Sequence, residues 1–297
     1  MNGLRIAAES TPTAPVVPGR RVGWRRVGRF MAHRPGLVAS VLIMIVVLVA
    51  AFAPGVLTSA DPIVGVPADK LRSPEAHHLF GTDQLGRDLF ARVVYGTSLS
   101  IRTTMIAVAV GLVVGSATGL VAGFFGGWID EIVMRIVDVL LAIPSLLLSL
   151  ALVTALGVGT VNVAVAVGVP TIANFARVMR AETLRVCNAV FVEAARSTGA
   201  GWWWVLSRHV LPHAWGPVTV LTTLEIGVAV LSVSGLSFLG YGATPPAPEW
   251  GSLVADGRDY LATSWWLSTL PGLTIALTVL AANRISRALD GEWARVR

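Results

Sequence analysis

Residues that could support catalysis or metal binding are few in this sequence and lie far apart. The only lysine, Lys70, follows no Gly-x-x-x-x-Gly stretch, so the chain contains no phosphate-binding P-loop. His77 and His78 are adjacent in a polar stretch, where histidines are more often solvated than metal-bound, because a metal site needs further convergent ligands. The sole cysteine, Cys187, can form neither an intrachain disulfide nor a cysteine cluster.

A second pair of histidines, His209 and His213, has the i, i+4 spacing of one helix face. We expect Pro212 to end a helix between them, and no carboxylate or cysteine adjoins the pair to complete a metal site. The sequence also contains no zincin motif, serine nucleophile elbow or dinucleotide fingerprint. These observations predict that the chain is not an enzyme and holds no metal or cofactor of its own.

The elements that carry these residues are predicted to be membrane-spanning helices. Of the 297 residues, 54% are hydrophobic and 13% are charged, whereas a soluble domain carries about 25% charged residues. A span needs about 20 apolar residues, and the uncharged run 139–176 is long enough for two, joined by a glycine turn at 157–159. The sequence therefore predicts an all-α membrane protein with six transmembrane helices, at 36–57, 103–129, two within 139–176, 217–240 and 266–288.

The net charge of +6 is explained by orientation in the membrane and does not indicate a nucleic-acid partner, because the basic residues separate apolar runs and form no patch. With the N-terminus inside, the cytoplasmic segments hold 17 basic and 7 acidic residues, and the outside segments hold 5 and 8. Basic residues near span ends stay cytoplasmic, so both termini are predicted to be cytoplasmic. We expect a disordered basic tail at 1–30, a first span within 31–57, an extracytoplasmic loop at 58–102, a five-helix core at 103–290 and a short tail at 291–297.

The long cytoplasmic stretch at about 177–216 is the most informative segment. It predicts a helix with small residues at Ala194, Ala195 and Gly199, a break at 199–201, and a second short helix that stops before Pro212. Small residues permit close approach of a partner. The alternative is a plain connector whose tryptophans, at 202–204, lie among the lipid headgroups.

The residues of this stretch resemble the EAA loop of ABC importer permeases. Glu193-Ala194-Ala195, Gly199 four positions later, and Leu211-Pro212 with the proline thirteen positions after that glycine match the motif in residue type and spacing. His213 departs from it, since peptide-transporting members generally continue with Asn. In that family the loop forms a coupling helix that docks into a groove on the cytoplasmic ATPase, so the resemblance implies that Glu193, Ala194, Ala195, Gly199, Leu211 and Pro212 couple this chain to an ATPase.

Two further stretches resemble the C subunits of dipeptide and oligopeptide permeases. They are Phe80 to Arg92, which reads FGTDQLGRDLFAR, and Leu236 to Gly242 (LSFLGYG) with Glu249 to Leu253 (EWGSL). The first predicts a capped turn in which Thr82 or Asp83 satisfies the first amides of a helix and Gly86 bends the chain. By resemblance, its polar surface also suits docking of a substrate-binding protein, through Thr82, Asp83, Gly86, Arg87 and Asp88.

Three ionisable residues, Arg102, Asp138 and Glu225, fall at or inside the predicted spans. We expect Asp138 to pair with Arg135, three positions away. Glu225 is the better candidate for a charge on a transport pathway, where a peptide's amino terminus is a plausible counter-charge; pairing within the helix bundle is the commoner alternative. Relatives often carry a glutamate where this chain has Val233, so no carboxylate role is transferred to that position.

The resemblance spans roughly residues 28 to 290 and implies the type I ABC importer permease fold with a cytoplasmic EAA coupling loop. It implies a bacterial inner-membrane importer of di- or oligopeptides. This chain would pair in the lipid bilayer with a homologous permease, with two ATPase subunits that bind ATP and Mg, and with an extracytoplasmic binding protein. Close relatives of these subunits import nickel, glutathione or haem, which leaves those substrates open. An ATP-independent secondary transporter is the remaining alternative; it would be expected to show internal repeats, which we do not find.

Overall fold

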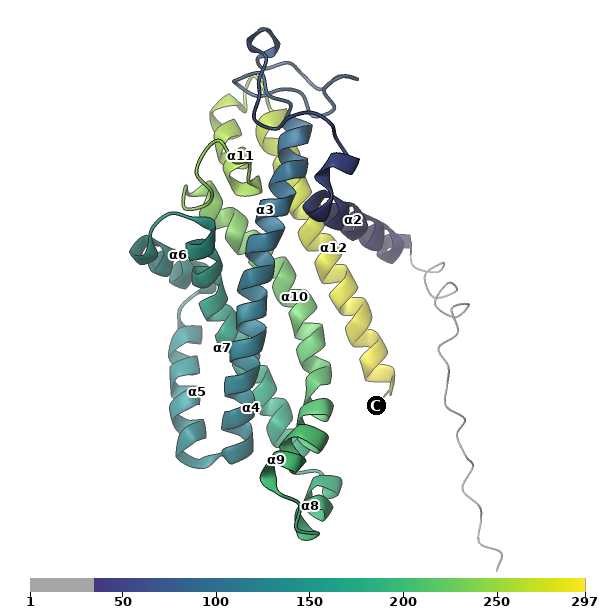
Figure 1. Ribbon diagram of the computed structural model, residues 1–297, viewed down its shortest axis with the longest axis vertical. Helices are drawn as coiled ribbons and strands as arrows, with labels where there is room; N and C mark the ends of the chain where they lie inside the picture. The colour runs from purple at the N-terminus through teal and green to yellow at the C-terminus, as the bar shows by residue number, and fades with distance from the viewer. Residues whose placement is uncertain (1–34, 297) are drawn as a thin grey trace, which may run out of the picture.

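The computed structural model describes residues 35–296, with side chains described for residues 35–288. The predicted tail at 1–30 lies outside this range. Every regular element that it describes is helical, so the all-α prediction is confirmed for this part of the chain (Figure 1). The α-helices are α2 (Pro35–Phe52), α3 (Leu89–Val110), α4 (Ser116–Phe125), α5 (Gly127–Ala142), α6 (Ser145–Leu156), α7 (Thr160–Cys187), α8 (Val190–Ser197), α9 (Trp202–Val205), α10 (Leu211–Phe238), α11 (Trp250–Gly257) and α12 (Trp266–Val296).

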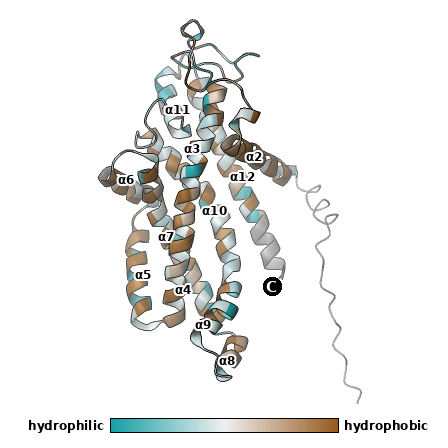
Figure 2. Cartoon of the chain, in the orientation of Figure 1, coloured by the Kyte–Doolittle hydropathy of each residue, from teal (hydrophilic) through white to brown (hydrophobic). Residues whose placement is uncertain are grey.

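Five helical segments of residues 35–296 are long and apolar enough to cross a membrane. They are Pro35–Phe52, Leu89–Phe125, Thr160–Cys187, Trp202–Phe238 and Trp266–Ala288. The predicted number of six is reached only when the pair α5 and α6 counts as one broken span. In Figure 2 the ribbons of α2, α5 and α6 are largely coloured as hydrophobic, and many large apolar side chains of these helices are exposed, as expected for helices that face lipid or another membrane subunit.

The third predicted span is not a continuous helix, which corrects the sequence-based expectation. Helices α5 and α6 meet at an angle of 95° across Ile143 and Pro144. Ile143 has an extended backbone (ψ 132°), because the ring of a following proline excludes the helical conformation of the residue before it. Charge counting along the sequence does not register this break.

The turn between α6 and α7 is the glycine turn predicted from sequence. Gly157 and Gly159 have φ of 91° and 138°, a region that side chains other than glycine rarely enter. The amide of Asn162 donates to the carbonyls of Leu156 (3.0 Å) and Gly157 (3.2 Å), which satisfies two groups at the C-terminus of α6. The start of α7 is fixed by this turn.

Helix α7 lies at the centre of the bundle and packs against α3, α4, α5, α6 and α10. Glycines at four-residue spacing, at 111, 115, 119 and 123, lie on the π-helical turn and α4 where these elements contact α7. A Cβ at Gly115 or Gly119 would collide with the backbone carbonyl of Ile172 or Ala176. These positions therefore require glycine, and they let two helix backbones meet directly, as small residues do in membrane helix packing.

The second span begins well before the position predicted from sequence. Helix α3 starts at Leu89, and with a π-helical turn at Gly111–Gly115 and α4 it forms one segment to Phe125. The expected start at Thr103 came from the last charge before the apolar run, Arg102, yet the helix continues through this exposed arginine. The predicted boundary between loop and core at residues 102 and 103 therefore lies inside a continuous helix, because the start of a helix depends on its cap and not on the nearest charge.

The end of the molecule that carries α11 also carries the polar segment between α2 and α3 (Figure 1). Trp250, at the start of α11, is fully buried. Its indole nitrogen donates to the carbonyl of Val93 (3.2 Å) and its backbone amide to the hydroxyl of Ser100 (3.1 Å), both on α3. This side chain ties the segment between α10 and α12 to the second span.

Candidate functional site

Helix α8 and the following turn form a projection at the end of the bundle opposite α11 (Figure 1). We call residues 190–201 the projecting segment. It contains Glu193, Ala194, Ala195 and Gly199, whereas Leu211 and Pro212 lie in the first turn of α10. The predicted helix over the small residues and the break at 199–201 are therefore present, but the first part of the predicted loop, to Cys187, continues α7.

One side of α8 is anchored in the protein and the other is open to a partner. Val192 is fully buried and belongs to the same apolar core as Val205 and Val210. Glu193, Ala194 and Gly199 are exposed, and Ala195 is half-buried against the core. The small side chains thus leave the backbone of a helix anchored by Val192 accessible, which is the geometry that close docking requires.

Gly199 ends α8 in a Schellman motif. The amide of Ala200 donates to the carbonyl of Ala195 (3.2 Å) and the amide of Gly199 to that of Arg196 (3.0 Å). Gly199 has a φ of 81°, and no heavy atom lies within 4 Å of the position that a Cβ would occupy. The glycine is therefore explained first as a helix cap. The space around it is nevertheless free for a partner surface.

The prediction that a helix stops before Pro212 is wrong. Residues Trp202–Phe238 form one helical segment, in which a π-helical turn, Leu206–Val210, joins α9 to α10. Pro212 lies in the first turn of α10, where a missing amide hydrogen costs little. The projecting segment is thus continuous, through α9, with a span of the bundle.

Aromatic side chains hold the projecting segment against the bundle. The ring centre of Phe191 on α8 lies 5.0 Å from that of His213 and 6.1 Å from that of His209. The guanidinium of Arg196 lies over the ring of Phe124 at the end of α4. The two histidines therefore pack against aromatic rings, and residues 35–288 contain no group of three or more His, Cys, Asp or Glu side chains suited to a metal ion.

At the opposite end, Asp83 organises the polar segment before α3. One carboxylate oxygen accepts from the amides of Leu85 (2.8 Å) and Arg87 (3.0 Å), and the other accepts from the Arg87 Nε (2.6 Å). Arg92 lies 3.5 Å from the same carboxylate and donates to the carbonyl of Pro62 (3.0 Å). All three charged side chains are buried.

A second carboxylate, Asp256 of α11, borders this cluster. Partial burial raises the pKa of Asp256, the nearby Asp83 raises it further, and the positive charges of Arg92 and Arg87 lower it. The cluster therefore joins the polar segment, α3 and α11 at one point.

The helix cap predicted at Thr82 or Asp83 is formed by Asp88 instead. The Asp88 carboxylate accepts from the amide of Ala91 (2.8 Å) and pairs through its other oxygen with His78 Nδ1 (2.8 Å). Thr82 accepts from the amide of Arg72 and donates to the carbonyl of Asp69, so it closes a loop and caps no helix. The error arose because Thr82 bonds to groups ten and thirteen positions away, and Asp83 binds the amides of the turn before the helix, neither of which the spacing reveals.

Gly86 adopts a φ of 75°, as the predicted bend requires. Of the five residues expected to meet a binding protein, Thr82, Asp83, Gly86 and Arg87 are buried and Asp88 is half-buried. They shape the segment from inside, whereas Leu79 and Leu85 are exposed on it.

Inside the bundle, Glu225 is buried and accepts a hydrogen bond from the amide of Asn174 on α7 (2.9 Å). Asp138 pairs with Arg177 (2.6 Å), so the expected partner Arg135 is wrong. The replacement partner belongs to α7 and lies 39 residues away along the chain.

Sequence reasoning missed two features of these sites. Asp130 on α5 and Arg180 on α7 form a bidentate ion pair with two contacts of 2.5 Å across 50 residues of sequence. Arg92 is buried in the cluster around Asp83. The sequence signal for these residues is that each charge lies in a helix with an apolar face. That signal does not identify the residue with which each charge pairs.

Comparison with known proteins shows which family has a matching sequence. Residues 111–295 match the family described as the binding-protein-dependent transport system inner membrane component. The chain is 38% identical to the glutathione transport system permease protein GsiD of Pectobacterium atrosepticum, over 93% of each chain. It is 37% identical to the dipeptide transport system permease protein DppC of Alkalihalophilus pseudofirmus, over 90% of this chain and 88% of that protein. It is 35% identical to a probable D,D-dipeptide transport system permease protein, DdpC, of Escherichia coli, over 94% of each chain.

Solved structures show the same fold. The inward-facing MetNI methionine ABC transporter matches with a TM-score of 0.53 and 20% identity, over 67% of this chain and 96% of that chain. An amino acid ABC transporter structure matches with a TM-score of 0.55 and 15% identity, over 69% of this chain and 95% of that chain.

Proposed function

This chain belongs to the family of binding-protein-dependent transport system inner membrane components, and from that premise we propose that it imports di- or oligopeptides as one half of a translocation pathway. It is a membrane-spanning permease of a binding-protein-dependent ABC importer. The peptide class is supported by relatives named as dipeptide transport permeases, which match nearly the whole chain, while a glutathione transport permease matches to a similar degree and represents the alternative substrate. Identification of the molecule held by the partner binding protein tests the proposal, and nickel, glutathione or haem there would exclude it.

The projecting segment is the proposed contact with a cytoplasmic ATPase. The observation that carries this proposal is a helix anchored by Val192 whose exposed side includes Glu193, Ala194 and the Gly199 cap. Because α9 continues directly into α10, a displacement of this segment acts on a span of the bundle. ATP can drive transport only if the two pathway conformations differ in their contacts with the ATPase, and this segment is where such a difference would act.

The remaining partners follow from the same proposal. ATP and Mg are bound by the two ATPase subunits, and this chain contributes no catalytic group. A second, homologous permease completes the pathway, and an extracytoplasmic binding protein meets the end that carries α11 and the segment shaped by Asp83. Both termini are then cytoplasmic. Reporter fusions that place residues 241–265 in the cytoplasm would contradict this orientation.

Substitutions at Gly199 test the coupling proposal. Gly199→Ala and Gly199→Trp both force a side chain onto a φ of 81°, which costs about 1–2 kcal/mol locally, but only tryptophan fills the free space. We expect both complexes to assemble in the membrane, and only Gly199→Trp to lose substrate-stimulated ATP hydrolysis. Gly157→Trp, which combines a φ of 91° with open space at another turn, is the matched control.

Three outcomes would contradict the coupling proposal. Unimpaired stimulation in Gly199→Trp shows that no partner approaches this surface. An equal loss of substrate-stimulated ATP hydrolysis in Gly199→Ala shows that the loss comes from the disturbed helix cap alone. A solitary chain that transports without an ATPase identifies a secondary transporter.

A further inference from the structure

A cavity of about 640 Å³ lies between α2 and α12, on the outside of the bundle. The side chains that border it include two arginines, Arg284 and Arg287, and no carboxylate. Most of the remaining wall is apolar, with Leu37 and Ile43 on α2 and Leu277 on α12. We propose that this groove binds an anionic phospholipid, whose phosphate contacts Arg284 and whose acyl chains lie along the apolar wall.

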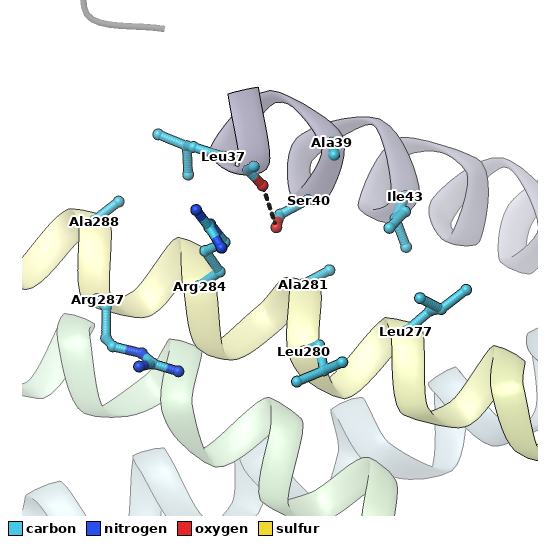
Figure 3. Close-up of a pocket in the computed structure, with 11 residues that line it drawn as sticks. Leu37, Ala39, Ser40, Ile43, Leu277, Leu280, Ala281, Arg284, Arg287 and Ala288 are labelled. Atoms are coloured by element: carbon cyan, nitrogen blue, oxygen red, sulfur yellow. Dashed lines mark hydrogen bonds between the residues drawn. The ribbon is translucent and has the colours of Figure 1, made fainter. Parts of the chain in front are cut away.

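The position of Arg284 supports an anion at this place. Figure 3 shows its side chain directed from α12 toward α2, into the space beside Ser40. The guanidinium lies directly against Gly36, in the space that a Cβ at this position would occupy. Arg284 is exposed and forms no ion pair with any other side chain described here. Among the side chains of residues 35–288, none therefore compensates this positive charge, and the guanidinium has hydrogen-bond donors to offer an anion.

The surroundings favour a lipid over a soluble anion. Both helices are membrane-span candidates, and Arg284 lies within the last turns of the segment Trp266–Ala288, the level at which a span meets the headgroups. The outward side chains of Leu42 on α2 and Leu280 on α12 are exposed, as expected for surfaces that contact acyl chains. A free phosphate has no apolar part that could pack against this wall, whereas the acyl chains of a lipid do. Basic pockets between membrane helices are typical sites for anionic lipid headgroups.

Ser40 adds a second polar contact. Its hydroxyl donates to the carbonyl of Gly36 (2.8 Å), the bond drawn as a dashed line in Figure 3. With its hydrogen used in this bond, the oxygen is left to accept from a lipid headgroup hydroxyl such as those of phosphatidylglycerol. The groove thus has one cationic contact, one acceptor and an apolar wall.

The chain itself supplies a matched control. Arg287 lies one turn after Arg284, is also exposed and also borders the groove, but in Figure 3 its guanidinium points away from α2, so the proposed phosphate contact belongs to Arg284 and not to Arg287. Arg284→Gln and Arg287→Gln therefore remove the same charge from the same helix, on opposite sides. Ala39→Phe leaves both arginines in place and fills the groove, since Ala39 is an exposed residue of its wall.

The experiment is a lipid titration of the purified, assembled transporter, with bound lipids counted by native mass spectrometry. Phosphatidylglycerol is compared with phosphatidylcholine, and glycerol phosphate serves as a soluble competitor. We expect tighter binding of phosphatidylglycerol, weakened about fivefold by Arg284→Gln and changed less than about twofold by Arg287→Gln. Ala39→Phe is expected to lower binding to a similar degree, with assembly and thermal unfolding unchanged.

Each other result would overturn the proposal. Equal losses in the two arginine variants indicate diffuse surface charge. Full binding by Ala39→Phe places the lipid elsewhere, and competition by glycerol phosphate at concentrations similar to the lipid identifies a soluble-anion site. Failure of Ala39→Phe to assemble with the second permease would show that a protein helix covers the groove.

Discussion

The buried pair formed by Glu225 and Asn174 allows a test between a structural and a transport role. The carboxylate is 5% exposed and accepts one hydrogen bond, from the Asn174 amide at 2.9 Å. None of the described basic side chains lies within ion-pair distance of it. If the pair holds α7 against α10, removal of the amide leaves a buried acceptor without its donor.

The expected magnitude follows from this geometry. Asn174→Leu keeps the approximate volume but removes the donor, which costs about 1–3 kcal/mol. Because the shift in the unfolding midpoint per kcal/mol falls with chain length, we expect a midpoint about 2–5 °C lower for a chain of 297 residues. Glu225→Gln keeps an oxygen that can accept the same bond and should cost less than about 1 kcal/mol. The double variant Asn174→Leu with Glu225→Met removes both polar groups, and it should regain most of the stability.

The assay combines thermal unfolding of the purified complex with uptake of peptides that have free or acetylated amino termini. A structural pair predicts that stability falls in Asn174→Leu and that Glu225→Gln takes up both peptides at similar rates. The reasoning is refuted if Glu225→Gln unfolds normally yet loses uptake only of peptides with a free amino terminus. That result would assign the carboxylate to the substrate.

Two further predictions concern packing and the polar segment. Gly119→Ala places a methyl group against a backbone carbonyl of α7 and should destabilise the chain by about 1–3 kcal/mol, whereas Gly55→Ala, which meets open space, should unfold like the parent. Asp83→Ala leaves two buried arginines without their carboxylate and should cost about 3–5 kcal/mol, with faster proteolysis of residues 58–88. Asp259→Ala removes an exposed pair and is the control for it, expected to change stability by less than about 1 kcal/mol.

The outcomes that oppose these two predictions are specific. Equal thermal unfolding of Gly119→Ala and the parent would show that the two helix backbones are not in contact. Unchanged proteolysis of Asp83→Ala would show that the cluster does not hold the polar segment in place.

Features that depend on neighbouring residues could be predicted from the sequence. The glycine turn between α6 and α7, most of the apolar spans and the small-residue helix ending near Gly199 all follow from local composition and spacing, because a bilayer demands long apolar runs and a reversal demands glycine. The family resemblance rested on the same local patterns, and the comparisons confirm it.

Local patterns failed where a backbone boundary depends on geometry. The sequence predicted a straight third span, but α5 and α6 meet at 95° at Pro144. The sequence predicted that a helix ends before Pro212, but a proline in the first turn of a helix is tolerated, and α10 continues to Phe238. The sequence predicted a start of the second span at Thr103, but the helix that contains it begins at Leu89, after the N-cap residue Asp88.

By itself the sequence determined the class of protein, the approximate spans and the position of the projecting segment, since these depend on residues close together in the chain. Only the tertiary structure decided which charges meet. Asp138 pairs with Arg177 and not with Arg135, and Glu225 meets Asn174 across 51 residues. Such contacts are set by how α5, α7 and α10 pack side by side. In an apolar environment a polar side chain binds whichever partner this packing brings within reach, not the one nearest in sequence.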